Sequence, residues 1–132
     1  MFRYLTVGCT DLERAIRFYD AALAPLGIAR RSSSDREAGY ARPGDDRCLF
    51  WVNLPFDGKP ATAGNGSMPA FTAESREAVD AFFHAGMAHG GSSEGAPGLR
   101  PYGAGFYACY LRDPDGNKLS AVHEGPGPDP ED

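Results

Sequence analysis

The chain has few of the residues that build metal centres and disulfide frameworks, with three histidines and three cysteines among 132 residues. Cys9, Cys48 and Cys109 show no Cys-x-x-Cys spacing, and an odd number of thiols is typical of a reduced cytoplasmic protein. No apolar stretch approaches the roughly 18 residues of a membrane-spanning helix. The first residues also lack the basic and apolar regions of a secretory signal. We therefore expect a cytoplasmic protein that has no membrane partner.

Positive charge is also in deficit, because 13 Lys and Arg residues stand against 18 Asp and Glu residues, a formal net charge of −5. This balance argues against a nucleic-acid partner held by overall charge. Four of the acids lie in residues 124–132, a segment without Lys or Arg, so the rest of the chain is close to neutral. Selection of a ligand must therefore depend on local charge.

What is present is a chain long enough for one domain with its own core, and a 42% hydrophobic fraction that excludes general disorder. Residues 3–9 predict a strand, and Thr10-Asp-Leu-Glu13 has the pattern of a capping box that begins a helix. Apolar residues at helical spacing continue this helix until Pro25 and Gly27 end it. Residues 55–66, rich in turn formers, predict a linker. Three short strands are predicted between helix and linker, at residues 28–31, 39–41 and 48–54.

The same order of elements recurs after the linker. Residues 68–73 predict a strand, and Ser75 is a good N-cap for a helix that ends at Gly90-Gly91. Residues 92–105 are rich in Gly, Ser and Pro and predict a loop. Two further strands are predicted at residues 106–111 and 118–123, on either side of a tight turn at Asp113-Pro-Asp-Gly116.

A shift of 63 residues aligns the two predicted helices and indicates an internal repeat. The fold class is therefore α+β: two tandem β-α-β-β-β units, about residues 1–54 and 67–124, in a single domain of residues 1–124. Curved mixed sheets are expected to form a cup with the helices outside. Residues 125–132 are expected to be a disordered acidic tail.

Four segments, taken in order, match one known family. They are Thr10-Asp-Leu-Glu-Arg-Ala-Ile-Arg-Phe-Tyr19, Leu23-Ala-Pro-Leu-Gly27, Gly64-Asn-Gly66 and Asp113-Pro-Asp-Gly-Asn-Lys-Leu119. With them the chain resembles, over roughly residues 1–124, the vicinal oxygen chelate superfamily of glyoxalase I, extradiol dioxygenases and bleomycin resistance proteins. The resemblance implies the paired architecture, a homodimer, and a site inside the cup. In metal-dependent members that site holds zinc, nickel, manganese or iron.

The family's metal ligands are not conserved in kind here. The resemblance places its first-strand His at Tyr4, its second-unit His at Met68 and its last-strand Glu at Ser120, while residues 48–54 hold no carboxylate, His or Gln. A phenol, a thioether and a hydroxyl do not replace imidazole and carboxylate for such an ion. The histidines do not rebuild the site, since two fall on or after the second helix and His123 alternates to the opposite sheet face. We therefore expect no metal and no other cofactor.

Without a metal, the cup is a mostly apolar pocket with a few polar side chains, as is usual for a small-molecule site. Aromatic residues of the central strands stack on a planar ligand or simply pack in the core, and the sequence does not tell which face of residues 106–111 lines the cup. Arg100, between glycine and proline, is either a partner for a carboxylate or phosphate or a surface arginine. The candidate binding residues are Tyr4, Trp51, Met68, Arg100, Tyr102, Tyr107 and Ser120.

Three functions follow. The preferred one is a glyoxalase/bleomycin-resistance-like protein that binds a small organic molecule without a metal. One alternative is a metal-dependent lyase, isomerase or dioxygenase of the superfamily. The other is a metal-free enzyme with Tyr4 as acid or base, although no neighbouring base is visible in the sequence. The sequence leaves open whether the protein is an enzyme.

Overall fold

A computed structural model describes residues 1–125 of the chain, so the predicted tail lies outside the described residues except for Gly125. The first unit contains β1 (Leu5–Gly8), α1 (Leu12–Leu23), the 3-10 helix η1 (Ala24–Leu26), β2 (Ala29–Ser33), β3 (Glu37–Ala41) and β4 (Phe50–Asn53). The second unit contains β5 (Ala70–Thr72), α2 (Arg76–Ala88), β6 (Ser92–Leu99), β7 (Phe106–Arg112) and β8 (Lys118–Glu124). Each predicted strand overlaps an observed one, and the α+β class is confirmed.

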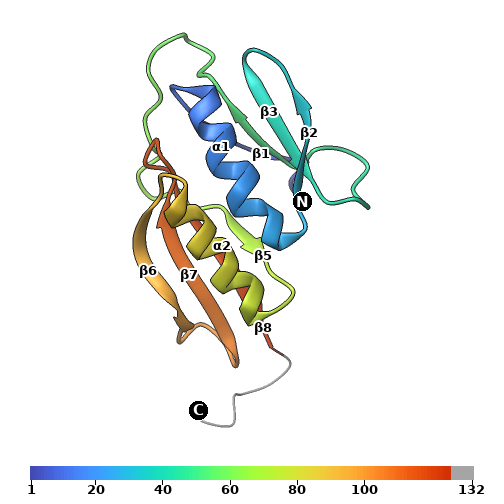
Figure 1. The fold of residues 1–132 in the computed structure, drawn as a ribbon, viewed down its shortest axis with the longest axis vertical. Helices are drawn as coiled ribbons and strands as arrows, with labels where there is room; N and C mark the ends of the chain where they lie inside the picture. The colour runs from blue at the N-terminus through green and yellow to red at the C-terminus, as the bar shows by residue number, and fades with distance from the viewer. Residues whose placement is uncertain (126–132) are drawn as a thin grey trace.

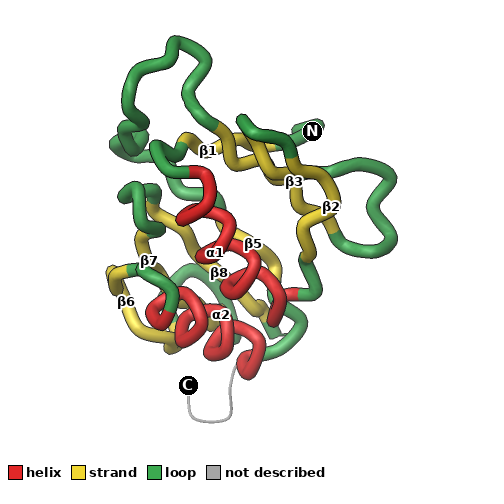
Figure 2. Tube along the Cα trace, turned by 45° about the horizontal axis from the view of Figure 1, so that its top comes forward, coloured by secondary structure: helices red, strands yellow, loops and turns green. Residues whose placement is uncertain are grey.

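The two units have the same topology. Their sheets follow the orders β1-β4-β3-β2 and β5-β8-β7-β6, and in each the first strand pairs in parallel while the other pairs are antiparallel. The sheets do not close into a barrel, and α1 and α2 pack against each other between them (Figure 1 and Figure 2). Each sheet therefore has one face against the helices and one open face.

The buried positions of the helices relate the units by 64 residues rather than by the predicted 63. The α1 set is Ala15, Phe18, Tyr19 and Ala22, and the α2 set is Val79, Phe82, Phe83 and Gly86. Cys9 and Ala73 obey the same shift, because each backbone N–H donates to the adjacent parallel strand, at Asn53 and Val122. The sequence match at 63 paired apolar residues without regard to which of them face the core.

The capping box predicted for α1 is wrong, whereas the second cap is confirmed. Asp11 is the N-cap, and its carboxylate accepts from the Arg14 N–H at 3.1 Å. The Thr10 hydroxyl instead accepts from the Ala61 N–H at 3.0 Å and so holds the linker. In α2 the Ser75 hydroxyl caps the helix by accepting from the Ala78 N–H at 3.0 Å.

The loop predicted for residues 92–105 is wrong over its first part, because β6 runs through it. This edge strand pairs with β7, and its register shifts twice, between Ser93 and Gly95 and between Gly95 and Gly98. A shift of this kind accommodates a proline, which has no N–H for the ladder. Gly95 is required for packing, since a Cβ there would lie 3.0 Å from the Tyr110 ring.

One buried cluster of apolar side chains spans both units. Phe50 of the first sheet and Phe71 of the second meet edge to face with ring centroids 5.0 Å apart. All three cysteines are free and buried, and burial is the main cause that raises the pKa of Cys9 to about 11. No helix in the described part of the chain is both long and apolar enough to cross a membrane.

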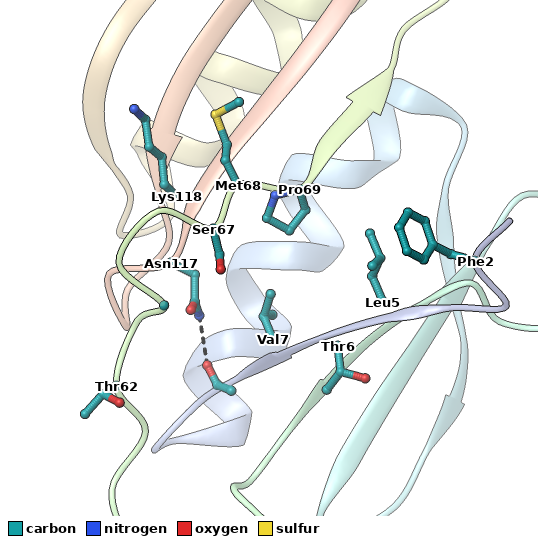
Figure 3. Close-up of a pocket in the computed structure, with 12 residues that line it drawn as sticks. Phe2, Leu5, Thr6, Val7, Thr62, Ser67, Met68, Pro69, Asn117 and Lys118 are labelled. Atoms are coloured by element: carbon teal, nitrogen blue, oxygen red, sulfur yellow. Dashed lines mark hydrogen bonds between the residues drawn. The ribbon is translucent and has the colours of Figure 1, made fainter.

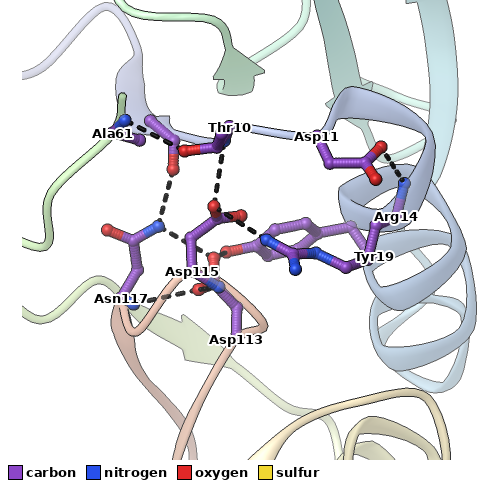
Figure 4. Close-up of polar contacts among 9 residues, drawn as sticks. Thr10, Asp11, Arg14, Tyr19, Ala61, Asp113, Asp115 and Asn117 are labelled. Carbon is purple, nitrogen blue, oxygen red and sulfur yellow. Dashed lines mark hydrogen bonds and ion pairs between the residues drawn. The ribbon is translucent and has the colours of Figure 1, made fainter. Parts of the chain in front are cut away.

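A buried polar network joins α1 and β1 to the turn between β7 and β8 (Figure 4). The Tyr19 hydroxyl donates to Asp113 Oδ2 at 2.5 Å, and Asn117 Nδ2 donates to the same oxygen at 2.9 Å and to the Gly8 carbonyl at 2.8 Å. Burial, followed by the charge of Asp113, raises the pKa of Tyr19 well above its ordinary value. The tyrosine therefore stays protonated and remains a donor.

A second carboxylate of the same turn continues this network. Asp115 Oδ1 accepts from the Thr10 N–H at 2.9 Å and from Arg14 Nη2 at 3.1 Å. The predicted tight turn is thus also the hydrogen-bonded joint between residues about 100 positions apart in the sequence.

Tyr19→Phe is predicted to lower the free energy of unfolding by about 1–3 kcal/mol, because the buried Asp113 carboxylate loses a donor. Chemical denaturation measures this change. Tyr102→Phe is the matched control, since the Tyr102 side chain is exposed and loses the same hydroxyl. Equal effects of the two substitutions would contradict the role given to the Tyr19 hydroxyl.

Candidate functional site

A cavity of about 490 Å³ lies on the open face of the second sheet. Four of the residues predicted from the sequence line it, namely Met68, Arg100, Tyr102 and Ser120. We call it the second-sheet cavity and define it by these four residues together with Glu94, Phe106, Tyr110, Lys118 and Val122. Alternation along β7 and β8 places these side chains on one face, so β7 turns Phe106 and Tyr110 toward the cavity.

Ser120 lies at the base of this cavity. The residue is fully buried, and its hydroxyl has no hydrogen-bond partner within the described residues. Its backbone N–H donates to the Pro69 carbonyl at 3.0 Å, and β8 pairs it with Tyr110 of β7. A buried hydroxyl without a partner is costly for the fold, and a bound ligand is one way to satisfy it.

Two cations contact the Tyr110 ring. The guanidinium carbon of Arg100 lies 5.3 Å from the ring centroid and the ammonium of Lys118 lies 5.7 Å from it. Sequence reasoning missed Lys118 and gave no preference to Tyr110. Lys118 stands two residues before Ser120, so strand alternation was the signal that places both on one face.

A second cavity of about 520 Å³, the edge groove, lies between β1 and the segment that leads into β5. Leu5, Thr6 and Val7 line it from β1, and Ser67, Met68 and Pro69 line it from the other side (Figure 3). Met68 and Lys118 line both cavities, so the two spaces are neighbours.

Three of the predicted residues lie outside the second-sheet cavity. Tyr4 precedes β1, is half exposed, and has the Arg47 guanidinium 5.9 Å from its ring centroid. Trp51 lies on the first sheet beside Gly39, where a Cβ would come within 2.8 Å of its ring carbons. Neither residue shares the second-sheet cavity with Ser120.

Tyr107 lies on the opposite face of the second sheet, toward α2. Its hydroxyl donates to Asp80 at 2.6 Å, and this hydrogen bond is the main cause that raises its pKa to about 12. The Arg76 guanidinium lies 5.1 Å from its ring. Its placement among the cavity residues is therefore corrected: Tyr107 faces a helix, and Tyr110 occupies the place in the cavity.

The side chains at the family's ligand positions do not form a metal site. Tyr4 is apart from the second-sheet cavity, and only Met68 and Ser120 of the three positions line it. Within residues 1–125, no three His, Cys, Asp or Glu side chains form a group suited to a metal ion. His123 hydrogen-bonds the Ala73 carbonyl at 3.0 Å, away from Ser120. The donor set thus does not fit the ions of the metal-dependent members.

The model of the Glyoxalase/Bleomycin resistance protein/Dioxygenase superfamily matches residues 2–120. The chain belongs to this superfamily. A glyoxalase/bleomycin resistance protein from Albidiferax ferrireducens T118 is 44% identical, with a TM-score of 0.84 over 95% of this chain and 99% of its own. The resemblance stated from the sequence is confirmed.

More distant superfamily structures share the fold alone. A glyoxalase-related enzyme from Fulvimarina pelagi is 20% identical, with a TM-score of 0.73 over 98% of this chain and 95% of its own. A glyoxalase/bleomycin resistance protein/dioxygenase family enzyme from Burkholderia phytofirmans PsJN is 19% identical, with a TM-score of 0.71 over 93% and 98%. No curated protein matches this superfamily member.

Gly39→Ala is predicted to displace the Trp51 ring, because the new Cβ would lie 2.8 Å from the ring and 2.9 Å from Cys48 Sγ. Trp51 is the single tryptophan, so its fluorescence emission reports the change directly, with an expected red shift as the ring moves toward water. The free energy of unfolding should fall by about 1–3 kcal/mol. Gly44→Ala is the control, since a Cβ there meets nothing within 4 Å. Unchanged emission in Gly39→Ala would contradict this packing.

Proposed function

We propose that this superfamily member binds a small organic molecule in the second-sheet cavity, without a divalent ion at the family's ligand positions. The observation that carries the proposal is Ser120. At the position of the last-strand carboxylate the chain has a neutral hydroxyl, which is fully buried, unpartnered among the described residues and at the base of a cavity.

The size and lining of the cavity support this function. Small-molecule sites have volumes of about 300–1,000 Å³ and apolar walls with a few placed polar groups. The second-sheet cavity, at about 490 Å³, combines Met68, Phe106 and Val122 with the polar groups of Arg100, Lys118 and Ser120.

The alternatives have weaker support. A metal-dependent lyase, isomerase or dioxygenase needs imidazole and carboxylate ligands, which positions 4, 68 and 120 lack. A metal-free enzyme with Tyr4 as acid or base needs a proton acceptor beside the phenol. The side chain in ring contact with Tyr4 is Arg47, a permanent cation that accepts no proton. A cytoplasmic location remains part of the proposal and agrees with three free, buried cysteines.

Metal analysis of the purified protein, combined with ligand screening after treatment with a chelator, tests the proposal. We expect less than stoichiometric zinc, nickel, manganese and iron, and stabilisation by members of a panel of small aromatic and anionic compounds. A ligand at 100 times its Kd adds about 2.7 kcal/mol to the free energy of unfolding.

Two results would overturn the proposal. One is a stoichiometric metal whose removal also abolishes ligand binding. The other is a complete lack of stabilisation by the panel in protein that has kept its fold.

We also propose that the chain forms a homodimer, as the resemblance implies. Large apolar side chains are exposed around the outer edge of β1, namely Phe2, Tyr4, Leu5 and Leu49. An apolar patch at an unpaired edge favours contact with a second copy. Light scattering is expected to give twice the mass of the chain, and Leu5→Glu is expected to shift the mass toward that of a monomer. A monomeric mass for the unaltered protein would refute the dimer.

A further inference from the structure

We infer that the ligand of the second-sheet cavity is a small organic anion whose carboxylate, or equivalent acidic group, lies between Arg100 and Lys118. This inference rests on the proposed function and adds the chemical class of the ligand.

The charges that line the second-sheet cavity do not cancel. Glu94 is its one acidic lining residue, and Glu94 Oε1 accepts from Arg112 Nε at 2.7 Å. This contact lowers the pKa of Glu94, so the carboxylate remains ionised and paired. Two positive charges, on Arg100 and Lys118, are left in a chain with a net charge of −5.

Both cations are positioned but have no carboxylate partner within ion-pair distance among residues 1–125. Arg100 Nη2 donates to the Ala96 carbonyl at 2.6 Å and Nη1 donates to the Leu99 carbonyl at 3.2 Å, which fixes the guanidinium and leaves further N–H donors. The Tyr110 ring contacts both cations. Like charges that share one ring repel each other, and a bound anion relieves this repulsion.

Ser120 supplies a third donor to the same place. It pairs across the strands with Tyr110, the residue whose ring contacts both cations. Its hydroxyl is fully buried and has no partner in the described structure. A carboxylate has acceptor capacity for a guanidinium, an ammonium and a hydroxyl together.

The rest of the cavity determines how the anion is oriented. Tyr102 and Phe106 meet edge to face with centroids 5.6 Å apart and form an aromatic wall. Glu124 lies at the far end of β8 from Lys118, where its carboxylate comes close to Gly103. A negative charge is therefore favoured at the Lys118 end, and an apolar or aromatic body is favoured toward Tyr102 and Phe106.

Calorimetric titration of the full chain with 2-naphthoate and with neutral 2-naphthamide tests the inference, because the two probes share an aromatic body and differ in charge. We expect naphthoate to bind at least tenfold more tightly, and its Kd to rise with sodium chloride concentration. Arg100→Gln and Lys118→Met should each weaken naphthoate binding by about tenfold, the usual effect of losing a charged hydrogen bond. Ser120→Ala should weaken it by a smaller factor.

Lys59→Met is the matched control, since it removes the same charge from the exposed linker. It should leave both affinities within about twofold, and naphthamide should be equally indifferent to Lys118→Met. Equal affinities for the two probes, or equal effects of Lys59→Met and Lys118→Met, would overturn the anion inference and leave the proposed function intact. If neither probe nor any other member of the panel binds, the proposed function itself fails.

Discussion

The hydrogen bond from the buried Tyr19 hydroxyl to Asp113 is the constraint on which the arrangement of the two units depends. Each unit has a small sheet and one helix, and neither buries its apolar helix face without the other. Asp113 fixes the turn before β8 by accepting from the backbone N–H groups of Asp115 and Asn117, and Asn117 in turn holds the Gly8 carbonyl at the end of β1. The joint is polar and directional, so it sets the relative position of the units more specifically than apolar packing alone.

The same turn determines where the chemistry of the cavity lies. Lys118 follows Asn117 directly, and Ser120 stands two residues further on the same face of β8. A rigid turn therefore delivers an ammonium and a hydroxyl to fixed places, while Arg100 comes from the end of an edge strand and is held by backbone carbonyls. Residues on strands that are anchored in this way provide more precise sites than residues on loops.

Much of the fold and part of the site could be predicted from the sequence, for physical reasons that differ from residue to residue. Ser75 was predictable as an N-cap because the cap is a local interaction, whereas the choice of Asp11 over Thr10 depends on Ala61 and Asp115, which are remote in sequence. The strand β6 escaped prediction because its glycines and proline carry no strand signal and only pairing with β7 orders them. Met68 and Ser120 were placed together by alternation, but the same rule could not decide between Tyr107 and Tyr110 without the phase of β7 relative to α2.

The change at position 120 connects the two proposals. In metal-dependent members of the superfamily the resemblance places a Glu there, and a buried carboxylate at that point would neutralise a nearby cation as well as bind a metal. The serine removes the negative charge, keeps one hydrogen-bond donor, and leaves Arg100 and Lys118 without an internal counter-ion. A cavity that has lost a carboxylate in this way favours a ligand that brings its own. The acidity of the whole chain does not oppose this preference, because the field of nearby cations in a cavity exceeds that of distant, solvent-screened acids.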